Sequence, residues 1–223
     1  MADIALVHGS FHGAWCWERV TPLLTAAGHR VHTPDLDGGR KSAADVLSEL
    51  DGPAILVGHS SGGMLISALA RLAPESATAL VYLSGFLLAP GRTPHDLGGG
   101  RGSLFDRALV VDREAGTMAI RPELAGELFY HDCDPADAAR ATARLTPEAL
   151  RRGASGPAEE SEVDSTRFYV ECLDDRALDP AKQRRMYTET PVEAVYSLDS
   201  GHSPFLSRPT ELAGVLDAIA RSR

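Results

Sequence analysis

The residues with the clearest capacity for chemistry lie in the stretch from Gly58 to Gly62, which has the pattern G-x-S-x-G. In this pattern a sharp turn between a strand and a helix lifts the central serine hydroxyl above a sheet edge. An apolar run precedes the pattern and a run with helical periodicity follows it, which argues against an ordinary Gly/Ser turn. We predict Ser60 as a nucleophile, because a pattern centred on Ser61 would put His59 where a glycine is needed.

A serine hydroxyl attacks well only when a positioned base takes its proton and a carboxylate stabilises the charge on that base. Asp174 and Asp175 follow an apolar run at 167–172, and His202 follows another at 192–196. An isolated histidine in the context G-H-S-P is typical of a surface loop, but its position behind the last strand pattern favours catalysis. The order Ser, Asp, His predicts a catalytic triad, in which either aspartate is a candidate.

Two backbone N–H groups are needed to stabilise the oxyanion that forms when a serine attacks a carbonyl carbon. One candidate is the N–H of Ser61, directly after the nucleophile. The other is the N–H of Ser10, in the glycine-rich loop that follows the apolar run at 4–7. We expect His8 to hold this loop by hydrogen bonding rather than to take part in the chemistry.

These side chains need a scaffold that brings distant parts of the chain together. Short apolar runs typical of buried strands alternate with amphipathic runs typical of helices. The predicted strands are at 4–7, 31–34, 55–59, 77–83, 167–172 and 192–196, and the predicted helices are at 15–27 (with a break or kink at Pro22), 42–50, 62–69, 180–187 and 209–220. Strands separated by single helices pair in parallel, so we expect an α/β sheet with helices on both faces. The carboxyl ends of its strands would bring the triad to one edge.

The alternation stops at residues 87–164, which we predict to form a cap inserted into a core made of residues 1–86 and 165–223, in a single domain overall. Helical patterns in the cap lie at 122–130, 135–144 and 147–152. A cluster of glycines follows no strand pattern and is interpreted as a hinge or loop tip rather than a nucleotide-binding loop: Gly98, Gly99, Gly100 and Gly102.

Aromatic residues of the cap and of the loop after the first strand are candidates for the substrate pocket. They are Phe11, His12, Phe105, Phe129 and Tyr130. For the cap residues among them, an internal core of the cap is an equally good interpretation.

The composition limits the classes of partner. The chain has 223 residues, 43% of them hydrophobic, with 22 basic and 31 acidic residues, which give a net charge of −9. Nucleic acid and anionic membranes are therefore poor partners.

Three widely spaced cysteines and the absence of a signal-like start or a membrane-length apolar run lead us to expect a cytoplasmic protein with reduced thiols. No metal-binding motif appears among the cysteines and histidines, so we expect no cofactor and no metal. Whether the protein forms a homodimer is left open.

Four stretches together resemble one known family. They look like the group of α/β-hydrolases that contains the plant methylesterases, such as the salicylate-binding methyl salicylate esterase, and the hydroxynitrile lyases. The stretches are VHGSFHGAWCWERVTPLLTAAGHRVHTPDLDG, GHSSGGM, CLDDRALDP and SGHSPFL. The resemblance implies an α/β-hydrolase fold with a six-stranded, mainly parallel sheet and a small helical cap. It also implies Ser60, Asp175 and His202 as the triad and the N–H groups of Ser10 and Ser61 as oxyanion donors.

We therefore expect a bacterial-type, cofactor-free serine hydrolase that cleaves small carboxylic esters through an acyl-serine intermediate. The resemblance implies substrates with an apolar or aromatic acyl part. Alternatives on the same triad are hydrolysis of thioesters or lactones, cyclisation in a biosynthetic pathway and cyanohydrin cleavage; a ligand-binding receptor with a hydrolase-like pocket is an alternative from another class. In the lyases a threonine precedes the first oxyanion donor and a lysine follows the histidine, whereas this chain has Gly9 and Ser203 at those positions.

Overall fold

A computed structural model of the chain describes residues 1–97, 102–150 and 165–223. Its centre is a six-stranded sheet in the order β2-β1-β3-β4-β8-β9, in which every neighbouring pair is parallel. The strands are β1 Asp3–Val7, β2 Arg30–His32, β3 Ala54–His59, β4 Ala77–Leu83, β8 Arg167–Cys172 and β9 Ala194–Leu198. All six strand patterns of the sequence are thus confirmed, with bounds that shift by a few residues.

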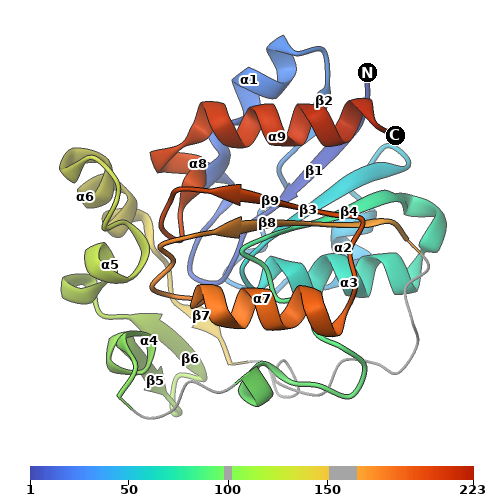
Figure 1. Cartoon of the computed structure of the whole chain (residues 1–223). Coiled ribbons are helices and arrows are strands. Elements are labelled where there is room, and N and C mark those ends of the chain that lie inside the picture. The colour runs from blue at the N-terminus through green and yellow to red at the C-terminus, as the bar shows by residue number, and fades with distance from the viewer. Residues whose placement is uncertain (98–101, 151–164) are drawn as a thin grey trace.

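Helices cover both faces of this sheet (Figure 1). The helical elements of the core are η1 Ala14–Trp17, α1 Thr21–Ala26, α2 Ala43–Leu47, α3 Gly62–Leu72, η2 Pro74–Ser76, α7 Pro180–Glu189, α8 Pro204–Ser207 and α9 Pro209–Arg221. Successive strand residues face opposite sides, so the central strand β3 sends Ile55 and Val57 toward η1, α1 and α9 and Leu56 toward α2, α3 and α7. Two apolar cores, one on each face, result from this alternation and hold the sheet in place.

The predicted helix at 15–27 is divided, and the division does not lie at Pro22. The chain forms η1, passes through turns at residues 18–20 and continues as α1, in which Pro22 lies in the first turn. Proline is tolerated there because the N–H groups of the first turn have no partner within the helix. At α2 the predicted N-cap is confirmed, since Ser42 accepts the N–H of Asp45 and forms a reciprocal capping box with it.

The predicted cap segment contains helices, but it is not only helical. Its elements are η3 Pro94–Leu97, α4 Leu104–Ala108, β5 Leu109–Asp112, β6 Thr117–Ile120, α5 Pro122–Phe129, α6 Pro135–Arg144 and β7 Glu148–Ala149. Strands β5, β6 and β7 form a second, antiparallel sheet beside the carboxyl ends of the main strands (Figure 1). The predicted small helical cap therefore contains the expected helices together with a short sheet that the sequence analysis did not predict.

The helical pattern at 147–152 was misleading for a physical reason. Glu148 and Ala149 pair with β6, and the N–H of Ala149 also donates to the carbonyl of Gly38, 3.0 Å away. Such backbone bonds to distant segments override a weak local preference for helix. Residues 151 and 152 lie outside the described part of the chain, as do Gly98, Gly99 and Gly100.

The cap elements share their apolar core with the loop after β1. Phe11 is buried together with Ala108, Leu128 and Phe129, and Trp15 packs against the same cluster. The domain boundaries at 86/87 and 164/165 remain predictions, but this shared core fixes the described part of the cap against the main sheet.

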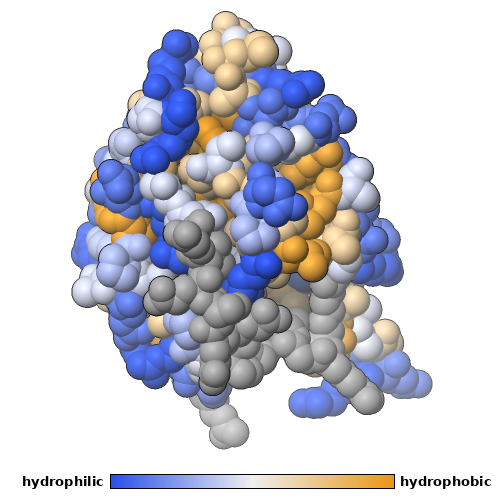
Figure 2. All heavy atoms as spheres, turned by 90° about the vertical axis from the view of Figure 1, so that its right-hand side faces the viewer, coloured by the Kyte–Doolittle hydropathy of each residue, from blue (hydrophilic) through white to orange (hydrophobic). Residues whose placement is uncertain are grey.

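On the face shown in Figure 2, hydrophilic side chains surround smaller hydrophobic areas. Among the described residues, no helix is both long and apolar enough to cross a membrane.

Candidate active site

Ser60 lies on a strained turn between β3 and α3. Its backbone has φ = 52°, the left-handed region that residues with a Cβ atom adopt at a cost of about 1–2 kcal/mol. Close packing maintains this conformation, because a Cβ at Gly58 would lie 2.6 Å from the carbonyl oxygen of Gly62 and a Cβ at Gly62 would lie 2.8 Å from the carbonyl oxygen of Val7. The glycines therefore have the steric role predicted for them: Gly58 lies against the start of α3, and Gly62 lies against the backbone at the end of β1. The side chain of Ser60 is partly exposed.

His202 and Asp175 form a buried pair at the same edge of the sheet. His202 Nδ1 lies 2.7 Å from Asp175 Oδ2, and the two residues are 2% and 4% exposed. A carboxylate accepts, so Nδ1–H donates and Nε2 is left to accept a proton. Asp174 does not take this position: its carboxylate lies at the surface and contacts His131 Nε2 at 3.0 Å. The geometry thus distinguishes the two aspartates that the sequence left open.

Further donors surround the buried Asp175 carboxylate. Its Oδ1 accepts the N–H groups of Ala177 and Leu178, each at 2.8 Å, and its Oδ2 accepts Gln183 Nε2 at 3.2 Å and the hydroxyl of Ser84. Hydrogen bonds of this kind stabilise the negative charge in a site that excludes water. The sequence analysis missed Ser84 and Gln183, although Ser84 directly follows β4 at the edge where the other site residues were expected.

The N–H of Ser10 points toward the first turn of α3. It donates to Ser61 Oγ at 2.7 Å, and the hydroxyl of Ser10 donates to the same oxygen at 2.8 Å. The loop reaches this position because Gly9 has no side chain: a Cβ there would lie 2.8 Å from Ser60 Cβ. The loop that carries Ser10 thus lies against Ser61, directly after Ser60, and the roles of the two N–H groups as oxyanion donors remain predictions.

The histidines around this loop are neutral parts of the structure. His8 Nδ1 donates to the carbonyl of Gly9 at 2.9 Å and its Nε2 accepts the N–H of Leu36 at 2.9 Å, and burial lowers its pKa. His59 is fully buried, which lowers its pKa well below the ordinary value, and its Nε2–H donates to the carbonyl of His202 at 2.9 Å. The role expected for His8, holding the loop, matches these contacts.

The predicted pocket residues fall into two groups. Phe11, His12, Phe129 and Tyr130 are between 1% and 3% exposed and pack on one another, whereas Phe105 is 37% exposed. Phe129 stacks on the imidazole of His202 at 5.5 Å between ring centroids. Of the five, Phe129 contacts His202 directly, and Phe11, His12 and Tyr130 pack in the aromatic cluster around Phe129. Contact of these residues with a substrate remains a prediction.

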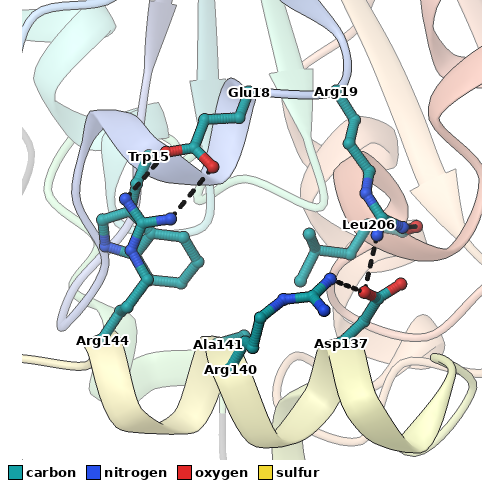
Figure 3. Close-up of a pocket in the computed structure, with 8 residues that line it drawn as sticks. All are labelled: Trp15, Glu18, Arg19, Asp137, Arg140, Ala141, Arg144 and Leu206. Atoms are coloured by element: carbon teal, nitrogen blue, oxygen red, sulfur yellow. Dashed lines mark hydrogen bonds and ion pairs between the residues drawn. The ribbon is translucent and has the colours of Figure 1, made fainter.

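A separate hollow lies where α6 meets η1 and α8, and Figure 3 shows the residues around it. Ion pairs span it: Arg144 contacts Glu18 at 2.8 and 3.0 Å, and Arg19 contacts Asp137 at 2.6 Å. It is lined by Trp15, Glu18, Arg19, Asp137, Arg140, Ala141, Arg144 and Leu206. None of these residues belongs to the Ser60 site. We therefore interpret the ion pairs around this hollow as contacts that hold the cap against the core.

The fold and the site define an α/β-hydrolase. The chain belongs to the alpha/beta hydrolase family, whose model matches residues 4–215. Among the described residues, no group of histidine, cysteine and carboxylate side chains is placed to hold a metal ion.

Individual relatives resemble the chain over almost all of its length. A pyrethroid hydrolase of Sphingobium wenxiniae is 36% identical and is aligned over 99% of this chain and 87% of its own. Methyl jasmonate esterase 1 of Vitis vinifera is 29% identical, over 97% of this chain and 96% of its own. The crystal structure of a pyrethroid hydrolase from Sphingobium faniae superposes with a TM-score of 0.85 at 31% identity, and covers 99% of this chain and 98% of that one.

Proposed function

We propose that this protein is a serine carboxylesterase that cleaves small carboxylic esters through an acyl-serine intermediate on Ser60. The observation that carries the proposal is the buried hydrogen bond of 2.7 Å between His202 Nδ1 and Asp175 Oδ2, at the sheet edge where Ser60 is held in its strained turn. A strained serine beside a histidine and an aspartate is the arrangement that activates a hydroxyl for acyl transfer.

The first half of the reaction forms the acyl-enzyme. Ser60 Oγ attacks the ester carbonyl carbon while its proton passes to Nε2 of His202, and Asp175 stabilises the imidazolium that results. The carbonyl oxygen becomes an oxyanion, which the N–H groups of Ser10 and Ser61 stabilise. Collapse of this intermediate breaks the C–O bond, and the imidazolium returns its proton to the departing alcohol.

The second half regenerates the serine. A water molecule loses a proton to His202 and attacks the acyl carbon. The second oxyanion then collapses, the bond between the acyl carbon and Ser60 Oγ breaks, and the imidazolium returns its proton to Oγ, which releases the carboxylic acid and restores the serine hydroxyl. No redox partner or cofactor is needed for either half. The buried aromatic residues beside His202 favour substrates with an apolar or aromatic acyl part, and the relatives described as pyrethroid hydrolase and methyl jasmonate esterase support esters as the class.

The experiment is a comparison of wild type with Ser60→Ala on a panel of aryl and methyl esters, together with labelling by a fluorophosphonate. We expect ester hydrolysis by the wild type, one labelled serine, and a loss of about 10⁴ to 10⁶ in kcat for the variant. A folded Ser60→Ala protein with near wild-type activity would exclude the mechanism. A wild type that binds esters without hydrolysing them would favour a ligand receptor.

The setting of the enzyme is part of the same proposal. We place it in the cytoplasm, and the three free cysteines, of which Cys16 and Cys172 are buried, support a reducing compartment. We propose no nucleic-acid or membrane partner because of the net charge of −9. The sedimentation behaviour of the purified protein would show whether it is a monomer or a homodimer.

A further inference from the structure

One carboxylate of the cap contacts the backbone of the loop that carries His202. Asp132, in the connection between α5 and α6, accepts the backbone N–H of Gly201 on Oδ2 at 2.7 Å. The approach is close, because a Cβ atom at Gly201 would lie 2.6 Å from Asp132 Oδ1 and 2.6 Å from Cε1 of His131. Gly201 is buried and directly precedes His202, so this bond acts one residue from the imidazole.

Two other hydrogen bonds hold the same loop from the core. The N–H of Asp174 donates to the carbonyl of Ser200 at 3.0 Å, and His59 Nε2–H donates to the carbonyl of His202 at 2.9 Å. Three consecutive residues, 200 to 202, are therefore each fixed through the backbone. The middle contact, at Gly201, is made by the cap.

The neighbours of Asp132 in sequence touch other parts of the site. The segment 129–132 places one side chain on each of four residues in and around the site: Phe129 on His202, Tyr130 on His12, His131 on Asp174 and Asp132 on Gly201. A change in the position of this segment would therefore reach both the aspartate loop and the histidine loop. Among these contacts, the one made by Asp132 joins a carboxylate directly to the backbone of the histidine loop.

We propose that Asp132 is a positioning residue for His202, which sets the imidazole against Asp175 and Ser60 by holding the N–H of Gly201. The inference rests on the proposed function. A hydrogen bond to a carboxylate is stronger and shorter than one between neutral groups, so it fixes the loop more tightly than a backbone carbonyl would. Catalysis by a triad is sensitive to placement, since a displacement of about 1 Å can cost about 100-fold in rate.

The test compares Asp132→Ala, Asp132→Asn and Asp134→Ala. The amide oxygen of Asn can still accept the N–H of Gly201, so Asp132→Asn should restore the contact that Ala removes. Asp134 is the matched control, because it also accepts a backbone N–H, that of Ala136 at 2.9 Å, but at the exposed start of α6 and away from the triad loops. Each variant is assayed on one aryl ester, and its thermal unfolding is recorded.

We expect Asp132→Ala to lower kcat by about 100-fold with KM changed less than about threefold, since the reacting geometry is altered rather than the pocket. Asp132→Asn should recover most of kcat, and Asp134→Ala should have wild-type kcat. A kcat for Asp132→Ala within about twofold of wild type, or an equal loss in Asp132→Asn, would overturn the proposal. If Asp132→Ala does not fold, Asp132→Asn and Asp132→Ser provide the comparison. We then expect the kcat of Asp132→Ser to lie between the kcat of Asp132→Asn and the value predicted for Asp132→Ala.

A second measurement separates this inference from the proposed function. The proton between His202 Nδ1 and Asp175 gives a downfield NMR signal that does not depend on any substrate. We expect this signal in the wild type and in Asp132→Asn, and its loss or broadening in Asp132→Ala. If no ester is hydrolysed but the signal behaves in this way, the function is wrong and the positioning role stands; an unchanged signal in Asp132→Ala would contradict the positioning role itself.

Discussion

The N–H of Ser10 donates to Ser61 Oγ, and the 2.7 Å between the two atoms is the distance at which it would hold a substrate oxygen. The hydroxyl of Ser10 donates to the same Oγ at 2.8 Å. A proposed oxyanion donor is thus engaged by a side chain of the protein itself. For the N–H of Ser10 to reach an oxyanion, the side chain of Ser61 must turn away and give up both bonds.

The first prediction concerns this competition. Ser61→Ala keeps the backbone N–H of residue 61 but removes the oxygen that engages Ser10, so we expect kcat/KM for small esters to rise. A hydrogen bond is worth about 0.5–1.5 kcal/mol net, which corresponds to a gain of about twofold to tenfold. Ser67→Ala is the control. The Ser67 hydroxyl also lies in α3, but it bonds to the carbonyl of Gly63 and the hydroxyl of Tyr82, so its removal should leave kcat/KM unchanged. A fall of tenfold or more in Ser61→Ala would mean that the hydroxyl donates to the oxyanion instead.

The second prediction separates the two adjacent aspartates. Asp175→Asn replaces the acceptor of His202 Nδ1–H and should lower kcat by about 10⁴, because the imidazole loses its orientation and the stabilisation of its charge. Asp174→Asn removes only a surface contact with His131, which is worth at most about 1 kcal/mol, and its backbone bond to Ser200 remains. Steady-state kinetics of the two variants are the measurement. If Asp174→Asn were the more damaging change, the pair seen in the structure would not be the catalytic one.

The sequence predicted the elements that are determined by local pattern. The bounds of β4, β8 and α6 agree with the structure to the residue, since a buried strand reads as a continuous apolar run and a helix shows a repeat of 3.6. Strands β5 and β6 were missed because they are short and partly exposed, with Val110 and Val111 at the surface. These residues form strands because they pair with each other and with β7. A short stretch of sequence carries no information about such pairing.

The same distinction applies to the site. Ser60 and His202 could be predicted because each has a local motif behind a strand, and the choice of Asp175 came from resemblance and agrees with the contact to His202. Asp132 and Gln183 carry no such motif. Asp132 contacts the backbone of Gly201, and Gln183 contacts Asp175 and the backbone of Cys172 and Leu178. These contacts join different elements, and only folding brings those elements together.

The third prediction concerns pH and stability. Burial lowers the pKa of His12 from 6.5 to about 3 in the folded protein, where Nδ1–H donates to the carbonyl of Ser10 and Nε2 accepts the hydroxyl of Tyr130. Above the ordinary pKa both states are neutral and His12 has no effect. Below it the unfolded chain binds a proton that the folded protein does not, so stability falls as the pH drops toward about 3. From about pH 7 to about pH 5 the loss from this group is about 2 kcal/mol.

Urea denaturation at the two pH values measures this loss. His12→Asn should show a smaller decrease in the free energy of unfolding than the wild type, by about 2 kcal/mol. His95→Asn is the control, because the ring of His95 is exposed and its removal should leave the wild-type decrease in place. An equal decrease in wild type and His12→Asn would show that His12 is protonated in the folded protein at about pH 5.

The fourth prediction is that the protein hydrolyses esters and does not cleave cyanohydrins. Cyanohydrin cleavage expels cyanide, an anion that a lysine ammonium can stabilise, and it needs the substrate hydroxyl held by a further side-chain hydroxyl. At the corresponding positions Gly9 has no hydroxyl and Ser203 has no charge. The structure adds that neither position accepts the larger residue easily: a Cβ at Gly9 would lie 2.8 Å from Ser60 Cβ, and Ser203 is fully buried.

The measurement is a paired assay of the wild type on aryl and methyl esters and on mandelonitrile and acetone cyanohydrin. We expect ester hydrolysis, with cyanide released from either cyanohydrin no faster than in buffer. Gly9→Thr is the informative variant: a threonine supplies the missing hydroxyl, but its Cβ displaces either the loop after β1 or Ser60, so ester hydrolysis should fall without any gain in cyanide release. Efficient release of cyanide by the wild type, without ester hydrolysis, would show that residues 9 and 203 do not decide between the two reactions. Cyanide release gained only in Gly9→Thr would instead show that the hydroxyl decides and that the loop tolerates the added side chain.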